Sequence, residues 1–293
     1  MSILVTGGTG FIGSHTVVCL MEAGYDVIIA DNLYNSSKDV LQSIQTITGK
    51  EVPFYEGDVS DTLFLESLFK THHFETIIHF AGYKAVGEST RIPLPYYRNN
   101  LLSTINLTDA ALKYHVPHLI FSSSATVYGD QASPLNEDCQ LQETSNPYGE
   151  TKAVSERILM DTVKANPQFS VTILRYFNPV GAHESGLIGE VPSGTPNNLM
   201  PYVTQVAKGK LAKLNVYGND YPTIDGTGVR DYIHVVDLAL GHMAALRHKP
   251  QGVAIYNIGT GKGSSVLEVI ETFKRINQMD IPYEIVERRP GDV

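Results

Sequence analysis

The chain has 293 residues, with 22 Lys and Arg against 31 Asp and Glu, a formal net charge of −9, and 42% apolar residues. This length suggests about two domains, and the apolar content is typical of a globular protein rather than a disordered one. The negative charge argues against a general nucleic-acid or membrane-surface binder, and no apolar run approaches the roughly 18 residues of a membrane span. Two cysteines cannot build a disulfide scaffold, and no signal peptide is visible, so we expect a cytoplasmic protein.

Short apolar runs alternate with amphipathic stretches along the first part of the chain. Strands are expected at residues 3–5, 26–30, 52–55, 76–80, 118–121 and 170–176. Helices are expected between them, at residues 12–23, 38–48, 63–71, 96–114 and 148–163. This alternation predicts βαβ units and an α/β fold with a doubly wound parallel sheet of the Rossmann type.

The pattern changes after residue 178. Residues 178–198 and 218–228 are rich in loop-forming residues, and shorter elements are expected at 199–208, 214–217, 235–246, 253–257, 266–276 and 283–286. We predict an NAD-binding Rossmann domain over residues 1–177, to which 231–258 return. Residues 178–230 and 259–293 would form a smaller C-terminal α/β substrate domain that supplies loops to a cleft.

A glycine-rich turn follows the first expected strand and opens the first helix. Gly7, Gly10 and Gly13 form the pattern G-x-x-G-x-x-G, which lets the backbone approach a pyrophosphate at the positive end of the helix. A tight turn without a ligand is the alternative. However, Asp31 ends the second strand 18 residues after Gly13, where an acid accepts hydrogen bonds from the adenosine ribose. Its charge would repel a 2′-phosphate, so we predict NAD rather than NADP.

A tyrosine and a lysine stand four residues apart at the start of a later helix. Tyr148 and Lys152 therefore share a helix face. The ammonium, together with a nicotinamide cation, would lower the pKa of the phenol and make it a general base. Upstream, residues 122–124 are serines at the end of a strand, where open α/β sheets bind ligands. The alternatives are a surface tyrosine with a solvated lysine, and serines that cap a turn.

These motifs, with several further segments, resemble the UDP-glucose 4-epimerase family of the extended short-chain dehydrogenase/reductase superfamily. The resemblance extends over essentially the whole chain, from Ile3 to Asp292. It rests on residues 7–13, 31–33, 79–82, 84–89, 122–129, 175–179, 196–201 and 228–234. Several of these segments are typical of the epimerases rather than of the superfamily.

The resemblance implies an NAD-dependent isomerase of galactose metabolism that interconverts UDP-glucose and UDP-galactose. Tyr148 would take the proton of the sugar 4-hydroxyl, Ser124 would hydrogen-bond the same oxygen, and Lys152 would hold the nicotinamide ribose and tune Tyr148. NAD would take hydride from C4, and the keto sugar would turn over before hydride returned to its other face. The cofactor would then be a bound catalyst that is not consumed.

The resemblance also implies the binding residues. Besides the three glycines, Tyr148 and Lys152, it assigns to the cofactor Phe11, Ile12, Asp31, Asn32, Asn35, Ser36, Asp58, Val59, Phe80, Ala81, Lys84, Asn99 and Tyr176. Besides Ser124, it assigns to the substrate Asn178, Asn197, Asn198, Leu199, Asn215, Tyr217, Arg230, Arg289 and Asp292. Arg suits bidentate recognition of the diphosphate, with a surface salt bridge as the alternative.

Several other functions fit part of the pattern. Another nucleotide-sugar epimerase, such as a UDP-N-acetylglucosamine 4-epimerase, or a nucleotide-sugar reductase would use the same motifs. A 4,6-dehydratase is disfavoured because Ala125 and Thr126 stand where dehydratases carry Asp and Glu. A non-catalytic NAD sensor is disfavoured because Ser124, Tyr148 and Lys152 are all present. No metal site is expected, because the histidines lack companion ligands at metal spacing.

Two further expectations come from the resemblance alone. It implies a homodimer that pairs the helices near residues 96–114 and 148–163, with no nucleic-acid or membrane partner. It also implies that family members continue beyond Val293, with a segment that adds helix to the substrate domain and gates N-acetylated sugars. We therefore expect a chain that ends at Val293 to bind NAD but to turn over poorly.

Overall fold

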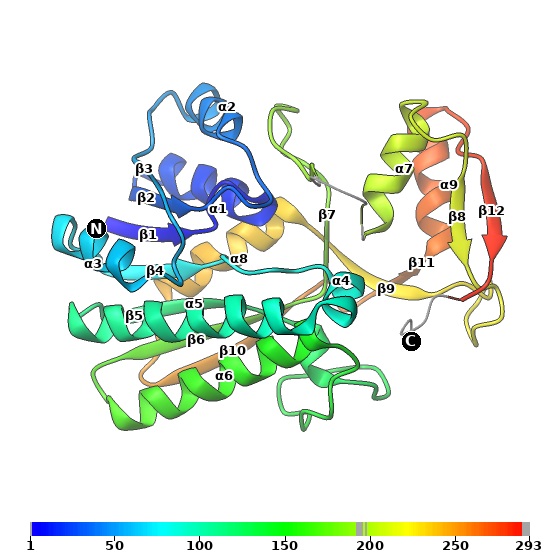
Figure 1. The fold of residues 1–293 in the computed structure, drawn as a ribbon. Helices are drawn as coiled ribbons and strands as arrows, with labels where there is room; N and C mark the ends of the chain where they lie inside the picture. Colours follow the sequence, from blue (N-terminus) through cyan, green and yellow to red (C-terminus); the bar gives the residue numbers. More distant parts are fainter. Residues whose placement is uncertain (1, 192–195, 197, 289–293) are drawn as a thin grey trace.

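A seven-stranded parallel sheet forms the centre of the molecule. The computed structural model describes residues 2–191, 196 and 198–288 (Figure 1). The strand order is β10-β6-β5-β4-β1-β2-β3. These strands are β1 (Ser2–Thr6), β2 (Asp26–Asp31), β3 (Phe54–Glu56), β4 (Thr76–His79), β5 (His118–Ser124), β6 (Ser170–Tyr176) and β10 (Val253–Ile258). The predicted α/β fold with a doubly wound parallel sheet is confirmed.

Helices cover both faces of this sheet. Along β1, successive side chains point to opposite faces, so Leu4 enters one hydrophobic core while Ile3 and Val5 enter the other. The core of Leu4 is closed by α3 (Thr62–Thr71), α5 (Pro93–Lys113) and α6 (Pro147–Ala165). The core of Ile3 is closed by α1 (Phe11–Glu22), α2 (Asp39–Thr48) and α8 (Val235–Arg247). The short helices α4 (Val86–Arg91) and η1 (Ala125–Tyr128) follow β4 and β5.

The smaller part of the molecule has its own core. It contains a three-stranded sheet with the strand order β11-β9-β7. These strands are β7 (Asn178–Val180), β9 (Val229–His234) and β11 (Gly263–Ser265). Beside it stand β8 (Leu214–Tyr217), β12 (Tyr283–Val286), α7 (Leu199–Ala207) and α9 (Val266–Asn277), drawn at the right of Figure 1. Val203, Leu214 and Ile270 pack together between these elements.

Most expected elements form within a few residues of their expected bounds, with some differences. Strand β5 extends to Ser124, because residues 122–124 pair in register with β6. The expected loop at 178–198 contains β7, and β9 was not expected as a strand. Helix α8 packs on α1, and β10 pairs with β6, so both belong to the main sheet unit. The limits of the two domains stay a prediction.

Candidate active site

The candidate site opens at the carboxyl ends of β1 and β4. The chain continues from β1 to β2 on one side and from β4 to β5 on the other, so the strand order reverses between them. Ligands of doubly wound sheets bind in the crevice at this switch point. A cavity of about 550 Å³ lies there, which is within the usual volume range of small-molecule sites.

The glycine turn is held closely against the neighbouring strands. A Cβ on Gly7, which has φ +73°, would lie 2.7 Å from the Ala81 nitrogen. A Cβ on Gly13 would lie 2.2 Å from the Gly7 oxygen. Gly10 is the N-cap of α1 and brings no side chain over the helix end. The first N–H groups of α1 therefore have neither an intrahelical nor a side-chain acceptor and suit a pyrophosphate.

Asp31 is fixed at the end of β2 by backbone donors. Its side chain accepts hydrogen bonds from the Thr9 nitrogen at 3.1 Å and the Leu33 nitrogen at 2.9 Å. Nearby, the Asn32 side chain donates to Asp58 at 3.1 Å. Partial burial raises the pKa of Asp58, but hydrogen bonds from Ser60 and Asn32 outweigh this and lower it. An uncapped helix terminus with an acid at the next strand end fits a dinucleotide with a free ribose 2′-hydroxyl.

The structure brings every predicted cofactor residue to the wall of this one cavity. The lining contains Gly7, Gly10, Phe11, Ile12, Gly13, Asp31, Asn32, Asn35, Ser36, Asp58, Val59, Phe80, Ala81, Lys84, Asn99, Tyr148, Lys152 and Tyr176. Residues far apart in the sequence are thus close in space, and their individual contacts with NAD stay predictions. The described part of the chain contains no group of three His, Cys, Asp or Glu residues placed to hold a metal ion.

Tyr148 and Lys152 lie on the first turns of α6, beside the end of β5. The helix starts there because Asn146 caps it, accepting a hydrogen bond from the Gly149 nitrogen at 2.8 Å, and Pro147 follows. Lys152 Nζ donates to the Ser122 carbonyl at 2.6 Å and lies 6.0 Å from the centroid of the Tyr148 ring. Both side chains therefore face the cavity rather than solvent, which excludes the alternative of a surface pair.

Ser124 ends β5 and also caps η1. Its hydroxyl oxygen accepts a hydrogen bond from the Thr126 nitrogen at 3.3 Å and one from Thr126 Oγ1 at 2.9 Å. The capping alternative therefore holds for Ser124, yet the same hydroxyl interacts with Tyr148. Ser124 therefore lies near Tyr148, although it is not among the residues that line the cavity.

In the protein alone, burial overrides the lowering of the pKa of Tyr148 that was expected from its pairing with Lys152. Burial raises the pKa of Tyr148 to about 12, and the hydrogen bond with Ser124 opposes this only in part. Burial also lowers the pKa of Lys152 to about 8, against the opposing attraction of Glu156. The lysine would therefore lose its proton before the tyrosine does, so a further cation is needed to make Tyr148 a base near neutral pH.

Other residues at the cavity had not been expected from the sequence. The rings of Tyr34 and Tyr83 are stacked, with centroids 4.5 Å apart, and both residues line the cavity. Glu190 also lines the cavity, and it forms an ion pair with Lys84, which had been expected from the sequence to bind the cofactor. Asn100 holds the neighbouring loop, accepting a hydrogen bond from the Tyr83 nitrogen at 2.7 Å. Nothing in the sequence pattern distinguishes these side chains, because their partners lie on other elements.

The predicted substrate residues lie outside the lining of this cavity. Asn178 is on β7 and Arg230 on β9, and these two strands pair. Leu199 begins α7, while Asn215 and Tyr217 are on β8. Asn198 Nδ2 donates to Glu190 at 2.9 Å and so links α7 to the cavity wall. The predictions for Asn197, Arg289 and Asp292 lie outside the described residues.

Comparison with known proteins identifies the family. Residues 3–259 match the NAD dependent epimerase/dehydratase family. A UDP-glucose 4-epimerase of Pasteurella multocida (strain Pm70) is 57% identical over 296 residues, covering 100% of this chain and 88% of that protein. The solved UDP-glucose 4-epimerase of Bifidobacterium longum, in complex with NAD+ and UDP, is 53% identical with a TM-score of 0.97, over 100% of this chain and 88% of that one.

A second solved structure agrees with this result. The UDP-glucose-4-epimerase of Stenotrophomonas maltophila, with bound NAD and formylated UDP-arabinopyranose, is 47% identical with a TM-score of 0.96, over 100% of this chain and 88% of that one. Sequence identity and backbone similarity thus extend along the whole chain, and they include both the candidate cavity and the smaller part of the molecule. The chain belongs to the NAD-dependent epimerase/dehydratase family and, within it, to the UDP-glucose 4-epimerases.

Proposed function

We propose that this enzyme interconverts UDP-glucose and UDP-galactose by oxidising and re-reducing C4 of the hexose. The observation that carries the proposal is the placement of Tyr148 and Lys152 in the wall of a cavity that fits NAD, with Ser124 next to Tyr148. Membership of the UDP-glucose 4-epimerases supports it. When bound, NAD accepts hydride from C4 and returns it to the opposite face of the sugar.

The side chains divide the proton chemistry between them. Tyr148 takes the proton of the 4-hydroxyl as C4 is oxidised and returns it after the sugar has turned. Ser124 holds the same oxygen by a hydrogen bond. Lys152, fixed by the Ser122 carbonyl, places a cation near the phenol. The positive charge of the oxidised nicotinamide would supply the further cation that the raised pKa of Tyr148 calls for.

We propose that the substrate lies between the cavity and the smaller part of the molecule. Arg230 on β9, and Arg289 beyond the described residues, would bind the diphosphate, because guanidinium groups contact two phosphate oxygens at once. Asn178 and Asn198 would offer amide groups to the sugar or diphosphate, and Tyr217 would face the uracil. Support comes from the relative of Bifidobacterium longum, which was solved with UDP.

The function is tested by product analysis on the full chain. UDP-glucose is added to the purified enzyme, and UDP-galactose is measured together with any accumulated reduced cofactor. We expect UDP-galactose without net reduction. The Tyr148→Phe variant should lower kcat by about 10²–10⁴-fold, whereas Tyr256→Phe, at a half-exposed ring on β10, should not.

The other outcomes would identify other activities. Reduced cofactor in proportion to enzyme, without UDP-galactose, would show that the sugar is oxidised but that hydride is not returned, and would refute the proposed epimerase cycle in favour of a dehydrogenase. Efficient turnover of UDP-N-acetylglucosamine but not of UDP-glucose would identify N-acetylated UDP-sugars as the substrates. Full activity of the Tyr148→Phe variant would show that Tyr148 is not the general base.

The homodimer and the cytoplasmic location expected from the sequence stay proposals. Leu94, Leu102 and Ile105 on α5 are exposed, and α5 packs beside α6, which supports an interface on this pair of helices. Within the described ranges, no helix combines the length and apolar character that crossing a membrane requires. Light scattering on the purified chain would measure its oligomeric state.

A further inference from the structure

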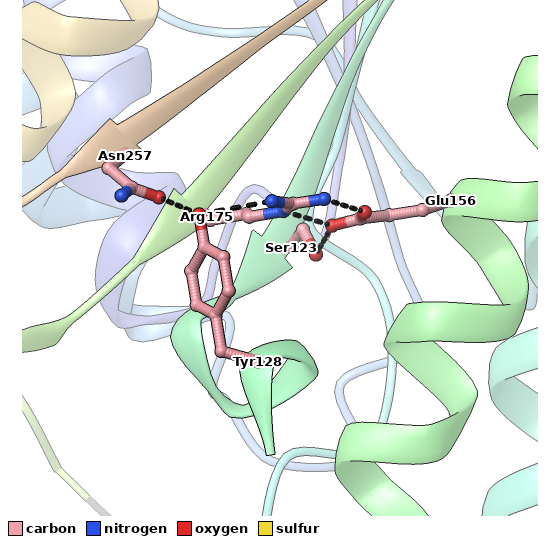
Figure 2. A network of polar contacts seen from close by, with 5 residues as sticks. All are labelled: Ser123, Tyr128, Glu156, Arg175 and Asn257. Atoms are coloured by element: carbon pink, nitrogen blue, oxygen red, sulfur yellow. Dashed lines mark hydrogen bonds and ion pairs between the residues drawn. The ribbon is translucent and has the colours of Figure 1, made fainter. Parts of the chain in front are cut away.

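A buried polar network joins Ser123, Tyr128, Glu156, Arg175 and Asn257 (Figure 2). Glu156 accepts two hydrogen bonds from Arg175, at 3.0 Å from Nε and 2.7 Å from the terminal guanidinium nitrogen. Ser123 Oγ donates to the same carboxylate at 2.5 Å. On its other side, Arg175 donates to the Tyr128 hydroxyl at 3.0 Å, and that hydroxyl donates to Asn257 at 2.7 Å.

Both charges of this network are almost completely removed from water. The side chain of Arg175 is 3% exposed and that of Glu156 is 0% exposed. Two charges in such a place are tolerated only when they satisfy each other, and replacement by apolar side chains often leaves a fold equally stable or more so. Stabilisation of the fold therefore does not by itself account for this buried ion pair, and the residues beside it indicate a second role.

Three members of the network lie close in sequence to residues of the proposed active site. Ser123 precedes Ser124 on β5, and Arg175 precedes Tyr176 on β6. Glu156 lies four residues after Lys152 on α6, so both are on one face of that helix. The network thus joins the strand that carries Ser124 to the helix that carries Tyr148 and Lys152, within the core of the protein.

We propose that Glu156, clamped by Arg175 and Ser123, is a positioning residue that fixes α6 against the end of β5 and so holds Tyr148, Lys152 and Ser124 in reacting geometry. The inference rests on the proposed epimerase function. The cap at Asn146 fixes the start of α6, and Lys152 Nζ reaches the Ser122 carbonyl of β5. The bond between Ser123 and Glu156 adds a second link between α6 and β5, one helical turn farther along α6. The bidentate contact with Arg175 also ties α6 to β6, the strand that pairs with β5, and so restricts the rotation of the helix against both strands.

Glu156 also contributes charge. Three titratable groups lie around Lys152: Glu156 and Tyr148 on α6, and His79 on β4. His79 is neutral near pH 7, because burial and then the charge of Lys152 lower its pKa to about 3. Glu156 is therefore the group that sustains the ammonium of Lys152. Loss of Glu156 should move the alkaline limb of the pH profile, where Lys152 loses its proton, to lower pH.

The test uses the full chain and a variant that leaves no buried charge unpaired. In the double variant Glu156→Gln/Arg175→Met, Ser123 keeps an amide partner. We expect kcat for UDP-glucose to fall on the order of 10²-fold, as for small misplacements of reacting groups. The KM, the bound NAD and the thermal midpoint should stay close to those of the wild type. Asp161→Asn, at an exposed ion pair on the same helix, is the control and should leave all four quantities unchanged.

A second variant covers the case in which the double variant does not fold. Ser123→Ala removes one hydrogen bond and no charge, so it should fold and lower kcat by about tenfold. Wild-type kcat and an unmoved alkaline limb in a folded double variant, or wild-type kcat in Ser123→Ala when the double variant is unfolded, would overturn the proposal. Absence of UDP-galactose with the wild-type enzyme would instead overturn the proposed function itself.

Discussion

Replacement of Lys152 by Met should show how much of the base strength of Tyr148 comes from the lysine charge. The ammonium lies 6.0 Å from the centroid of the Tyr148 ring. With an effective dielectric constant of about 20, two unit charges at this separation attract by about 3 kcal/mol, which is roughly 2 pKa units. Burial lowers the pKa of Lys152 only to about 8, so the lysine is charged at neutral pH, where Tyr148 would ionise in the proposed complex with oxidised NAD. Removal of the lysine charge from that complex should raise the pKa of Tyr148 by about this amount.

The assay is the pH dependence of kcat/KM for UDP-galactose, followed by coupled detection of UDP-glucose. The acid limb, which reports ionisation of Tyr148, should move up by about 2 pH units in Lys152→Met. At a fixed pH on that limb, the rate should fall on the order of 10²-fold. Lys164→Met, an exposed lysine of the same helix, serves as the matched control. An unmoved acid limb with an activity loss confined to KM would refute the electrostatic argument and leave Lys152 as a binding residue only.

Three further changes test the cavity and its surroundings. Asp31→Asn should weaken NAD binding by about 10–100-fold, because the ribose hydroxyls lose a charged acceptor; dialysis followed by assay of the retained cofactor measures this. Tyr83→Leu removes the stacked ring that joins it to Tyr34, and NAD should dissociate up to about tenfold faster if the pair holds the two cavity loops together; stopped-flow displacement measures the rate. His79→Gln should make unfolding less acid-sensitive. Burial lowers the pKa of His79 from 6.5 to about 3. Between these values the unfolded chain binds a proton that the folded chain does not, so the free energy of unfolding falls as pH falls. The wild type should lose at most about 5 kcal/mol over this range, and equal acid sensitivity of wild type and variant in denaturant titrations would contradict the assignment.

The features that the sequence predicts well are those that short stretches of chain determine. Gly7 and Gly13 mark the turn after β1 because a Cβ at either position would collide with neighbouring backbone, and Gly10 stands between them at the N-cap of α1. Tyr148 and Lys152 share a face because α6 forms where the cap and proline place its start. Parallel strands with helical crossovers then bring these segments to one edge of the sheet, so the composition of the cavity wall follows from the topology.

The features that the sequence does not predict depend on pairs distant along the chain. Strand β7 is short and contains proline, and it exists because β9 pairs with it. Asn100 acts through Tyr83 and through Thr151 on α6, and neither contact leaves a pattern in the sequence. The direction of the pKa shift of Tyr148 also depends on burial, which the spacing of a tyrosine and a lysine does not reveal.

Burial of Tyr148 also affects how proton transfer is coupled to hydride transfer in the proposed reaction. A phenol with a pKa near 12 is almost fully protonated at neutral pH in the chain alone, so oxidation of the sugar is disfavoured until a cation arrives beside it. In the proposed cycle, that cation is present while the cofactor is oxidised and disappears once hydride has been transferred. The pKa of Tyr148 would then rise again, so the phenol would keep the proton until hydride returns to C4 and the new alkoxide takes that proton. Burial of Tyr148 and Lys152 would thus couple the proton to the hydride in both directions, and the Lys152→Met profile separates the part that the protein supplies from the part that the cofactor supplies.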